Sequence, residues 1–174
     1  MNELTGLIKG NVAFIRQGIG LLGSIDRGLY NKTAPPVYDS SIGAHIRHIY
    51  DHYRQFVLGV ASGHVDYDGR ERDLHIETDC AHAVACLEQI IGQLTDIASS
   101  SQRAIDVSMN CGSKTNCPAQ STLARELQFL VSHTVHHYAL IALILRTEGV
   151  ATPSGFGVSP STLEYQARPV PHAV

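Results

Sequence analysis

The 174-residue chain has no tryptophan, and its charged residues amount to only 17% with a formal net charge of -3. So few basic residues disfavour nucleic acid or an anionic membrane surface as a partner, and we expect neither. No segment approaches the roughly 18 consecutive apolar residues of a membrane span, and the first residues lack the apolar core of a signal peptide. We therefore expect a cytoplasmic protein.

Cysteine motifs are missing as well. The four cysteines form two pairs with five residues between the members, Cys80 with Cys86 and Cys111 with Cys117. This spacing is neither a zinc knuckle nor a redox CxxC, and in a cytoplasmic chain we expect reduced thiols. A labile disulfide or an adventitious metal at Cys111 and Cys117 is the alternative. Histidine, by contrast, is abundant, with ten residues.

The length suits one domain with a substantial core and is too short for two. Apolar residues recur at steps of three and four in four segments, which predicts amphipathic helices. We expect these helices over residues 4–29, from Ser40 or Ser41 to about 61, from Thr78 or Asp79 to about 98, and from Ser121 or Thr122 to 148, before Gly149.

The segments between the predicted helices differ in character. Residues 64–77 are charged and aperiodic, and we predict an ordered loop there, while residues 104–109 alternate like a short strand. The tail from residue 150 holds four prolines and should be extended. Four helices joined by long loops favour an all-α helix bundle, with one domain over 1–174, a core at about 4–149 and a tail at 150–174.

The most informative segment is the last long one, residues 126–146. His133 and His137 lie four residues apart there, so both rings leave the same helix face. That face is also apolar and should point inward, where an unsatisfied polar group costs roughly 1–3 kcal/mol. Two imidazoles at this spacing can bind one metal ion.

The second predicted helix also carries a histidine stripe. His45, His48 and His52 fall within an arc of roughly 60 degrees. One of them would complete a three-histidine set with His133 and His137, leaving a fourth position for water or a thiolate. Three neutral ligands and water are typical of a catalytic zinc site, in which the pKa of the water falls to about 7.

These residues carry a family resemblance. The segment SIGAHIRHIYDHY followed by an HxxxH helix resembles the DinB/YfiT-like superfamily of metal-dependent enzymes, with a similar layout over about 4–149. The resemblance implies a four-helix bundle in up-down-down-up order, often dimeric. It also implies that a divalent metal is bound by His48, His133 and His137, since His48 lies seven residues after Ser41. Some members carry out metal-dependent thiol transfer or thiol-linked isomerisation.

Other residues are candidates for supporting roles. Asp51 and His136 are candidate acid–base groups, with a solvated acid and packing at a dimer face as the alternatives. His45, His52 and Glu126 are candidates to orient the ligand imidazoles through their outer nitrogens, and His45 or His52 could replace His48 as a ligand.

Two arginines complete the candidate site. Arg70 and Arg72 lie in the segment Tyr67–Asp73, which resembles one branch of the family, and they could contact an anionic substrate at the site mouth. The alternative is that both are solvated or salt-bridged.

The leading hypothesis is a divalent-metal-dependent enzyme of the hydrolase or thiol-transferase type. Its substrate would be a small molecule such as a thiol, its metal zinc or nickel, with iron or copper as alternatives, and its assembly a homodimer. The second hypothesis is a non-catalytic bundle whose histidines stabilise a dimer or sense metal, and a third is an inactive site on the same fold. An open coordination position beside a pocket would favour the enzyme.

Overall fold

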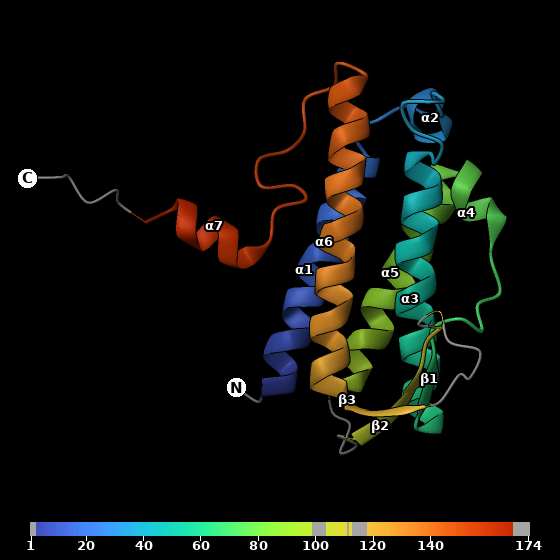
Figure 1. The fold of residues 1–174 in the computed structure, drawn as a ribbon, viewed down its shortest axis with the longest axis vertical. Helices are drawn as coiled ribbons and strands as arrows, with labels where there is room; N and C mark the ends of the chain where they lie inside the picture. The colour runs from blue at the N-terminus through green and yellow to red at the C-terminus, as the bar shows by residue number, and fades with distance from the viewer. Residues whose placement is uncertain (1–2, 99–103, 111, 113–117, 169–174) are drawn as a thin grey trace, which may run out of the picture.

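The protein is predominantly helical, as predicted, with one small sheet (Figure 1). The structure is a computed structural model and describes residues 3–98, 104–110, 112 and 118–168. Four long helices lie side by side: α1 (Glu3–Leu22), α3 (Ile42–Ser62), α5 (Cys80–Ile97) and α6 (Leu123–Thr147). Both α5 and α6 pack against α1 and α3.

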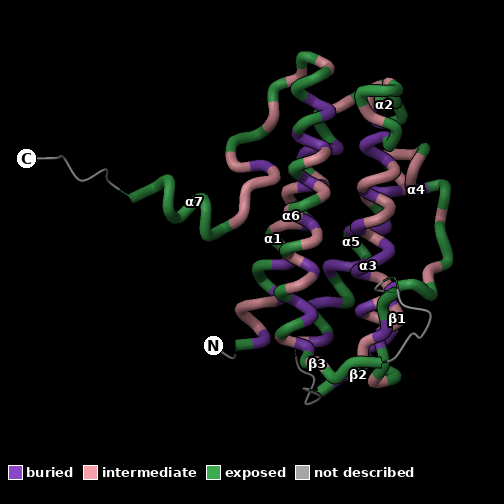
Figure 2. The backbone as a smooth tube through the Cα atoms, viewed as in Figure 1, coloured by how far each residue is buried: buried purple, intermediate pink, exposed green. Residues whose placement is uncertain are grey.

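The core fills the space between these helices (Figure 2). The completely buried side chain of Asn11 links three helices there. The Asn11 amide donates to the Leu127 carbonyl at 3.1 Å, and the Tyr53 hydroxyl donates to the Asn11 side-chain oxygen at 2.9 Å. Asn11 therefore meets the requirement that a buried polar group be hydrogen-bonded.

The predicted starts of two long helices are confirmed by their caps. The Ser41 hydroxyl accepts from the Ala44 amide at 3.0 Å to begin α3, and the Thr122 hydroxyl accepts from the Arg125 amide at 3.1 Å to begin α6. Gly63, with φ 79°, ends α3 in the left-handed conformation that glycine adopts at little cost.

The first predicted helix is too long. The structure ends α1 at Leu22 and starts a separate helix, α2 (Arg27–Asn31), whose cap Asp26 accepts from the Leu29 amide at 2.8 Å. Gly23 has a low helix propensity, and Asp26 is a strong N-cap, so the chain breaks between them. The apolar stripe continues across this break, which is why the periodicity did not reveal it.

The prediction of an ordered loop over residues 64–77 is correct only for residues 67–73, because a strand precedes them and a helix follows. Strand β1 (His64–Asp66) pairs in parallel with β2 (Ala104–Ser108), which pairs antiparallel with β3 (Ala119–Thr122), and α4 (Leu74–Thr78) follows. The expected strand near 104–109 is thus present. A three-residue strand and a single helical turn are too short to produce a periodic pattern.

The C-terminal tail is not simply extended. Pro160–Gln166 form helix α7, capped by the Ser159 hydroxyl, with Pro160 in the first turn, where proline is favoured. Phe156 is buried and stacks on Tyr138 with ring centroids 4.5 Å apart. The tail therefore packs against α6 before it reaches α7, while Pro169 and Pro171 lie outside the described residues.

Cys80 and Cys86 are free thiols, and Cys111 and Cys117 lie outside the described residues. Within the described part of the chain, α6 is long and apolar enough to cross a membrane by length and composition alone. The core helix of a soluble protein meets the same criterion, and α6 is a core helix here, so this is weak evidence for a span.

Candidate metal centre

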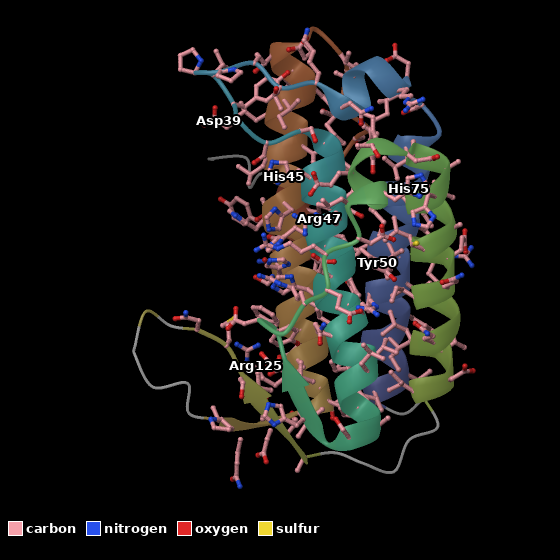
Figure 3. The ribbon with its side chains drawn as sticks, turned by 90° about the vertical axis from the view of Figure 1, so that its right-hand side faces the viewer. Asp39, His45, Arg47, Tyr50, His75 and Arg125 are labelled. Carbon is pink, nitrogen blue, oxygen red and sulfur yellow. The ribbon has the colours of Figure 1, made fainter. Side chains whose placement is uncertain are left out.

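Helices α3 and α6 bring two stripes of histidine together. His45, His48 and His52 come from α3, and His133 and His137 come from α6, which packs directly against it. Nitrogen atoms gather between these two helices near His45 in Figure 3. The helical repeat places each set on one face, as the spacing predicts.

Three of these rings converge on one point. One nitrogen from each of His48, His133 and His137 lies within 4.8 Å of the other two. His133 Nε2 and His137 Nε2 are 3.2 Å apart. Two imidazole nitrogens bound to one tetrahedral zinc ion would be separated by about 3.4 Å, given zinc–nitrogen bonds of 2.0–2.1 Å. The observed separation is close to that expected for two nitrogen atoms bound to one metal ion.

Burial keeps these imidazoles uncharged at neutral pH. Loss of solvent lowers the pKa of His48 to about 4, of His137 to about 3 and of His133 to about 2. Neighbouring rings add to the effect, and His52 is the largest such contributor for both His48 and His133. A neutral imidazole has a free lone pair, which is the form that binds a metal ion.

The residues present fit a divalent cation. His133 Nε2 faces His137 Nε2, and no side chain bonds the opposite nitrogen, the buried His133 Nδ1. Three neutral imidazoles are a donor set that zinc, nickel, iron and copper all accept. The described residues therefore contain a possible three-histidine metal site.

Comparison with known proteins assigns the family. The sequence profile of the DinB superfamily matches residues 19–141, well over half of the chain, and this range includes all three converging histidines. The chain belongs to the DinB superfamily. It is also 28% identical over 104 residues to "FK506-binding protein 5" of Rhizopus delemar, an alignment that covers 58% of this chain and 27% of that protein. The chain thus spans about a quarter of the length of that relative.

In this DinB protein, His45 contacts the outer side of one converging ring. Its Nδ1 lies 3.1 Å from His137 Nδ1, while His137 Nε2 faces His133. Burial, reinforced by His136, lowers the pKa of His45, which favours its neutral form, and neutral His45 can accept a hydrogen bond from His137 Nδ1–H. The structure therefore places His45 where a residue that orients His137 would stand.

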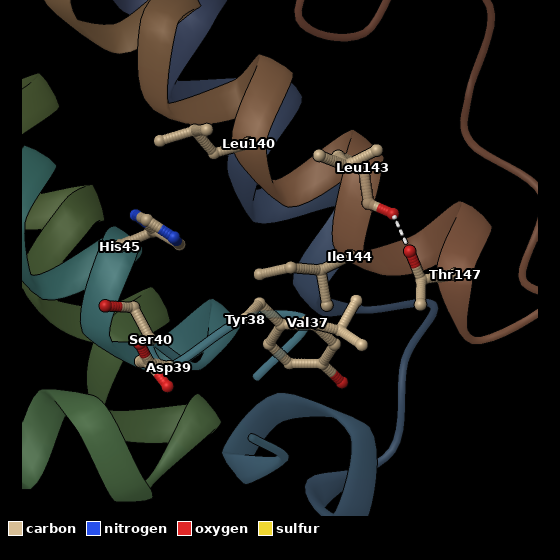
Figure 4. A pocket seen from close by; sticks show the side chains of 9 residues that line it. All are labelled: Val37, Tyr38, Asp39, Ser40, His45, Leu140, Leu143, Ile144 and Thr147. Atoms are coloured by element: carbon tan, nitrogen blue, oxygen red, sulfur yellow. Dashed lines mark hydrogen bonds between the residues drawn. The ribbon is translucent and has the colours of Figure 1, made fainter. Parts of the chain in front are cut away.

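His45 also forms part of the wall of a cavity of about 370 Å³ (Figure 4). The lining is mostly apolar and comes from α6 and from the segment before α3: Val37, Tyr38, Asp39, Ser40, Leu140, Leu143, Ile144 and Thr147. His45 thus connects the histidine cluster with a cavity of the size of a small-molecule site.

His52 forms another side of the cluster. It stacks on His133 with ring centroids 3.9 Å apart, and its Nδ1 donates to the His48 carbonyl at 2.9 Å. Burial lowers its pKa to about 4. Arg70 Nη1 lies 3.5 Å from His52 Nδ1, so this arginine stands at the edge of the cluster. Arg72 instead lines a separate cavity of about 350 Å³.

The acidic candidates have partners other than histidine. Glu126 accepts from the Tyr67 hydroxyl at 2.9 Å and from the Ser121 hydroxyl at 2.5 Å, which differs from the expected contact with His133. Seven residues of helix separate Glu126 from His133 by about 10 Å along the axis, so sharing a face does not bring them into contact.

Asp51 is buried and ion-paired, which differs from the solvated acid considered as its alternative. Its side chain is only 1% exposed and accepts from Arg47 Nη1 at 2.6 Å, and Arg47 also pairs with Glu77. Burial raises the pKa of Asp51, although Arg47 opposes the change. The structure thus places Asp51 in a buried ion-pair network. The other acid–base candidate, His136, is exposed, and its ring lies 5.0 Å from that of His137.

Two aromatic residues at the cluster were missed by sequence reasoning. Tyr67 stacks on His52 with ring centroids 5.4 Å apart, and the Phe129 ring lies 5.7 Å from that of His133. Phe129 is four residues before His133, so the helical repeat alone could have placed it there. Tyr67 could not be found this way, because it reaches the cluster from the end of β1.

Proposed function

We propose that this DinB-superfamily protein is a divalent-metal-dependent enzyme of the hydrolase or thiol-transferase type. His48, His133 and His137 are the proposed ligands. The observation that carries the proposal is the convergence of three neutral imidazole nitrogens from two helices, within 4.8 Å of one another. The cavity that begins at His45 supports an enzyme over a purely structural site, because it offers a substrate space next to a residue that contacts His137.

A divalent ion held there would act as a Lewis acid, either lowering the pKa of a water molecule to about 7 or favouring the thiolate form of a thiol. Zinc and nickel are the preferred ions, with iron and copper as alternatives, since all of them accept imidazole. The protein's own side chains orient and shield the ligands. His45 orients His137, and the stacked His52 shields His133 from solvent.

The substrate we propose is a small molecule, such as a thiol, with an apolar part. The apolar side chains of the 370 Å³ cavity would take up that part, and His45 marks the end next to the ligands. Arg70, 3.5 Å from His52, could contact an anionic group of the substrate. The exposed His136, beside His137, could accept or return a proton.

The wider architecture is part of the same proposal. We propose that α1, α3, α5 and α6 form the family's four-helix bundle in a single cytoplasmic domain that assembles as a homodimer. In Figure 1 the chain runs upward along α1, downward along α3 and α5, and upward along α6, which supports the up-down-down-up order.

Activity assays on zinc-loaded protein test the proposed reaction. One assay supplies a panel of activated esters, and the other supplies a small thiol together with an electrophilic aryl halide. We expect turnover in one of them, lost in His133→Ala and retained in His64→Ala, because His64 is an exposed residue hydrogen-bonded to Ser108 outside the cluster.

A binding measurement covers the case in which neither model substrate is accepted. Cobalt(II)-loaded protein should change its visible spectrum when a small thiol or anion is added, because an open position allows it to bind. A metal-loaded protein that shows neither turnover nor a spectral response would overturn the enzyme and support a non-catalytic metal-binding bundle.

A further inference from the structure

A second set of metal-ligating side chains lies where α4 meets α5. His82 and Cys86 are four residues apart on one face of α5, and Asp73 is the N-cap residue of α4. One ligand atom from each of the three lies within 4.8 Å of the other two. None of these residues belongs to the histidine cluster between α3 and α6.

The distances within this set resemble those around a metal ion. His82 Nε2 lies 3.6 Å from Cys86 Sγ, and a tetrahedral zinc ion with ordinary bond lengths would separate these atoms by about 3.5 Å. His82 Nε2 also lies 2.8 Å from Asp73 Oδ2, where a shared ion would require about 3.4 Å. A shift of about 0.6 Å in Asp73 would bring this pair to the separation that a shared ion requires.

Burial differs across the set in a way that suits ion entry. Cys86 is 7% exposed, whereas the side chains of His82 and Asp73 are 34% and 41% exposed. The sulfur is thus held in the core, and the two outer ligands face solvent and can adjust. Asp73 also lines the 350 Å³ cavity that contains Arg72, so the set opens onto a space that an ion can enter.

We propose that Asp73, His82 and Cys86 form a second divalent-cation site, suited to zinc. A carboxylate and a thiolate together balance the charge of a divalent ion, and the sulfur ligand favours a thiophilic metal over magnesium or calcium. His75, whose ring centroid lies 4.5 Å from that of His82, is available as a fourth ligand.

Such an ion would connect two parts of the molecule. Asp73 follows Arg70 by three residues, and Arg70 stands 3.5 Å from His52 at the edge of the histidine cluster. Fixing Asp73 to α5 would therefore restrict the segment that carries Arg70. The proposed second site uses only its own ligands, so it does not depend on whether the histidine cluster binds a metal ion.

Cobalt(II) distinguishes the two sites because only a thiolate ligand produces sulfur-to-cobalt charge-transfer absorption in the near ultraviolet. The full chain with Cys111→Ser and Cys117→Ser is titrated with cobalt(II). We expect this absorption to disappear in Cys86→Ser. In His133→Ala, which lacks the histidine site, it should persist and saturate at one ion per chain. Cys80→Ser, which removes another thiol from the same helix, is the matched control and should retain it.

Cys86 is buried, so Cys86→Ser could lose the band through misfolding alone. Asp73→Asn is a second variant that avoids this problem, because Asp73 is partly exposed. We expect this variant to need at least about tenfold more cobalt(II) for half-saturation of the charge-transfer band. Absence of the band at saturating cobalt(II), its survival in Cys86→Ser, or unchanged affinity in Asp73→Asn would each overturn the second site. Loss of the histidine site alone would leave the band intact, so the two proposals fail separately.

Discussion

Each ring of the histidine cluster has a different set of neighbours, and these neighbours define its role. His137 faces His133 through Nε2 and His45 through Nδ1, so both of its nitrogens are directed by other imidazoles. His133 has one nitrogen toward His137 and the other buried without a partner. A metal ion would engage the inner nitrogens, and His45 would hold the outer nitrogen of His137.

The contact of His45 with His137 leads to the first prediction. His45→Ala should weaken metal binding by about 10- to 100-fold, which is the usual cost of removing the partner of a ligand imidazole. Metal content at saturation should stay as in the wild type, because the three proposed ligands remain. Competition with a chromogenic chelator measures the affinity.

His64→Ala is the matched control for this variant and should leave the affinity unchanged, since His64 bonds to Ser108. Equal affinities for the wild type and His45→Ala would show that His45 only lines the cavity. Loss of metal even at saturation would instead show that His45 is itself a ligand.

The shared face of His133 and His137 was predictable because helix periodicity is regular over four residues, whereas the choice of His48 over His45 and His52 came from the family resemblance. The partner of Glu126 was not predictable, because a shared helix face says nothing about which side chains arrive from elsewhere. Arg47 reaches Asp51 from one turn away, whereas Tyr67 reaches Glu126 from a distant segment.

At the scale of elements, close backbone contact fixes α3 against its neighbours. A Cβ atom added to Gly43 would lie 2.1 Å from the Glu77 carbonyl oxygen, at the end of α4. One added to Gly59 would lie 2.6 Å from the His64 carbonyl oxygen, at the start of β1. Both contacts position the segment between β1 and α4, which carries Arg70, beside the histidine cluster.

The second prediction follows from the Gly43 contact. Gly43→Ala should lower the free energy of unfolding by about 1–3 kcal/mol, because the backbone of α4 must move away from the new methyl group. Gly10→Ala is the matched control in α1, where a Cβ meets nothing within 4 Å. It should raise the free energy of unfolding by about 0.5–1 kcal/mol through helix propensity.

Urea denaturation followed by circular dichroism measures both changes. If the Gly43 variant is as stable as the wild type, α4 does not pack against α3 as described. The comparison with Gly10→Ala separates this steric effect from the general effect of replacing glycine in a helix.

The bounds of α3, α5 and α6 were predictable to within a few residues because each begins at a strong N-cap and has many turns of regular spacing. Short elements were not, since β1 depends on pairing with β2, about forty residues further along the chain. The break after α1 and helix α7 were missed for a related reason. The N-caps Asp26 and Ser159 set where α2 and α7 begin, and the apolar pattern does not reveal these positions.

At the scale of the whole molecule, four tyrosines in the core make the free energy of unfolding depend on pH in the alkaline range. Burial raises the pKa of Tyr30, Tyr53, Tyr67 and Tyr138 well above the ordinary value of 10.0. Above pH 10 the unfolded chain releases these protons and the folded protein does not. The stabilisation is therefore complete below pH 10 and is lost as pH rises above it.

The third prediction is that the free energy of unfolding falls steeply above pH 10, by up to about 1.4 kcal/mol per pH unit for each buried tyrosine. Tyrosinate absorbance from these four residues should appear together with the loss of helical circular dichroism. Ionisation of all seven tyrosines while the helices remain intact would contradict the burial described for the core.

The central claim is that His48 from α3 and His133 and His137 from α6 hold one divalent ion. Elemental analysis of protein purified without a histidine tag, compared among variants that retain the wild-type circular dichroism, tests it most directly. We predict that His48→Ala and His137→Ala each contain one metal ion per chain fewer than the wild type, whereas His64→Ala contains the same amount. Unchanged metal content in His48→Ala and His137→Ala would contradict the claim.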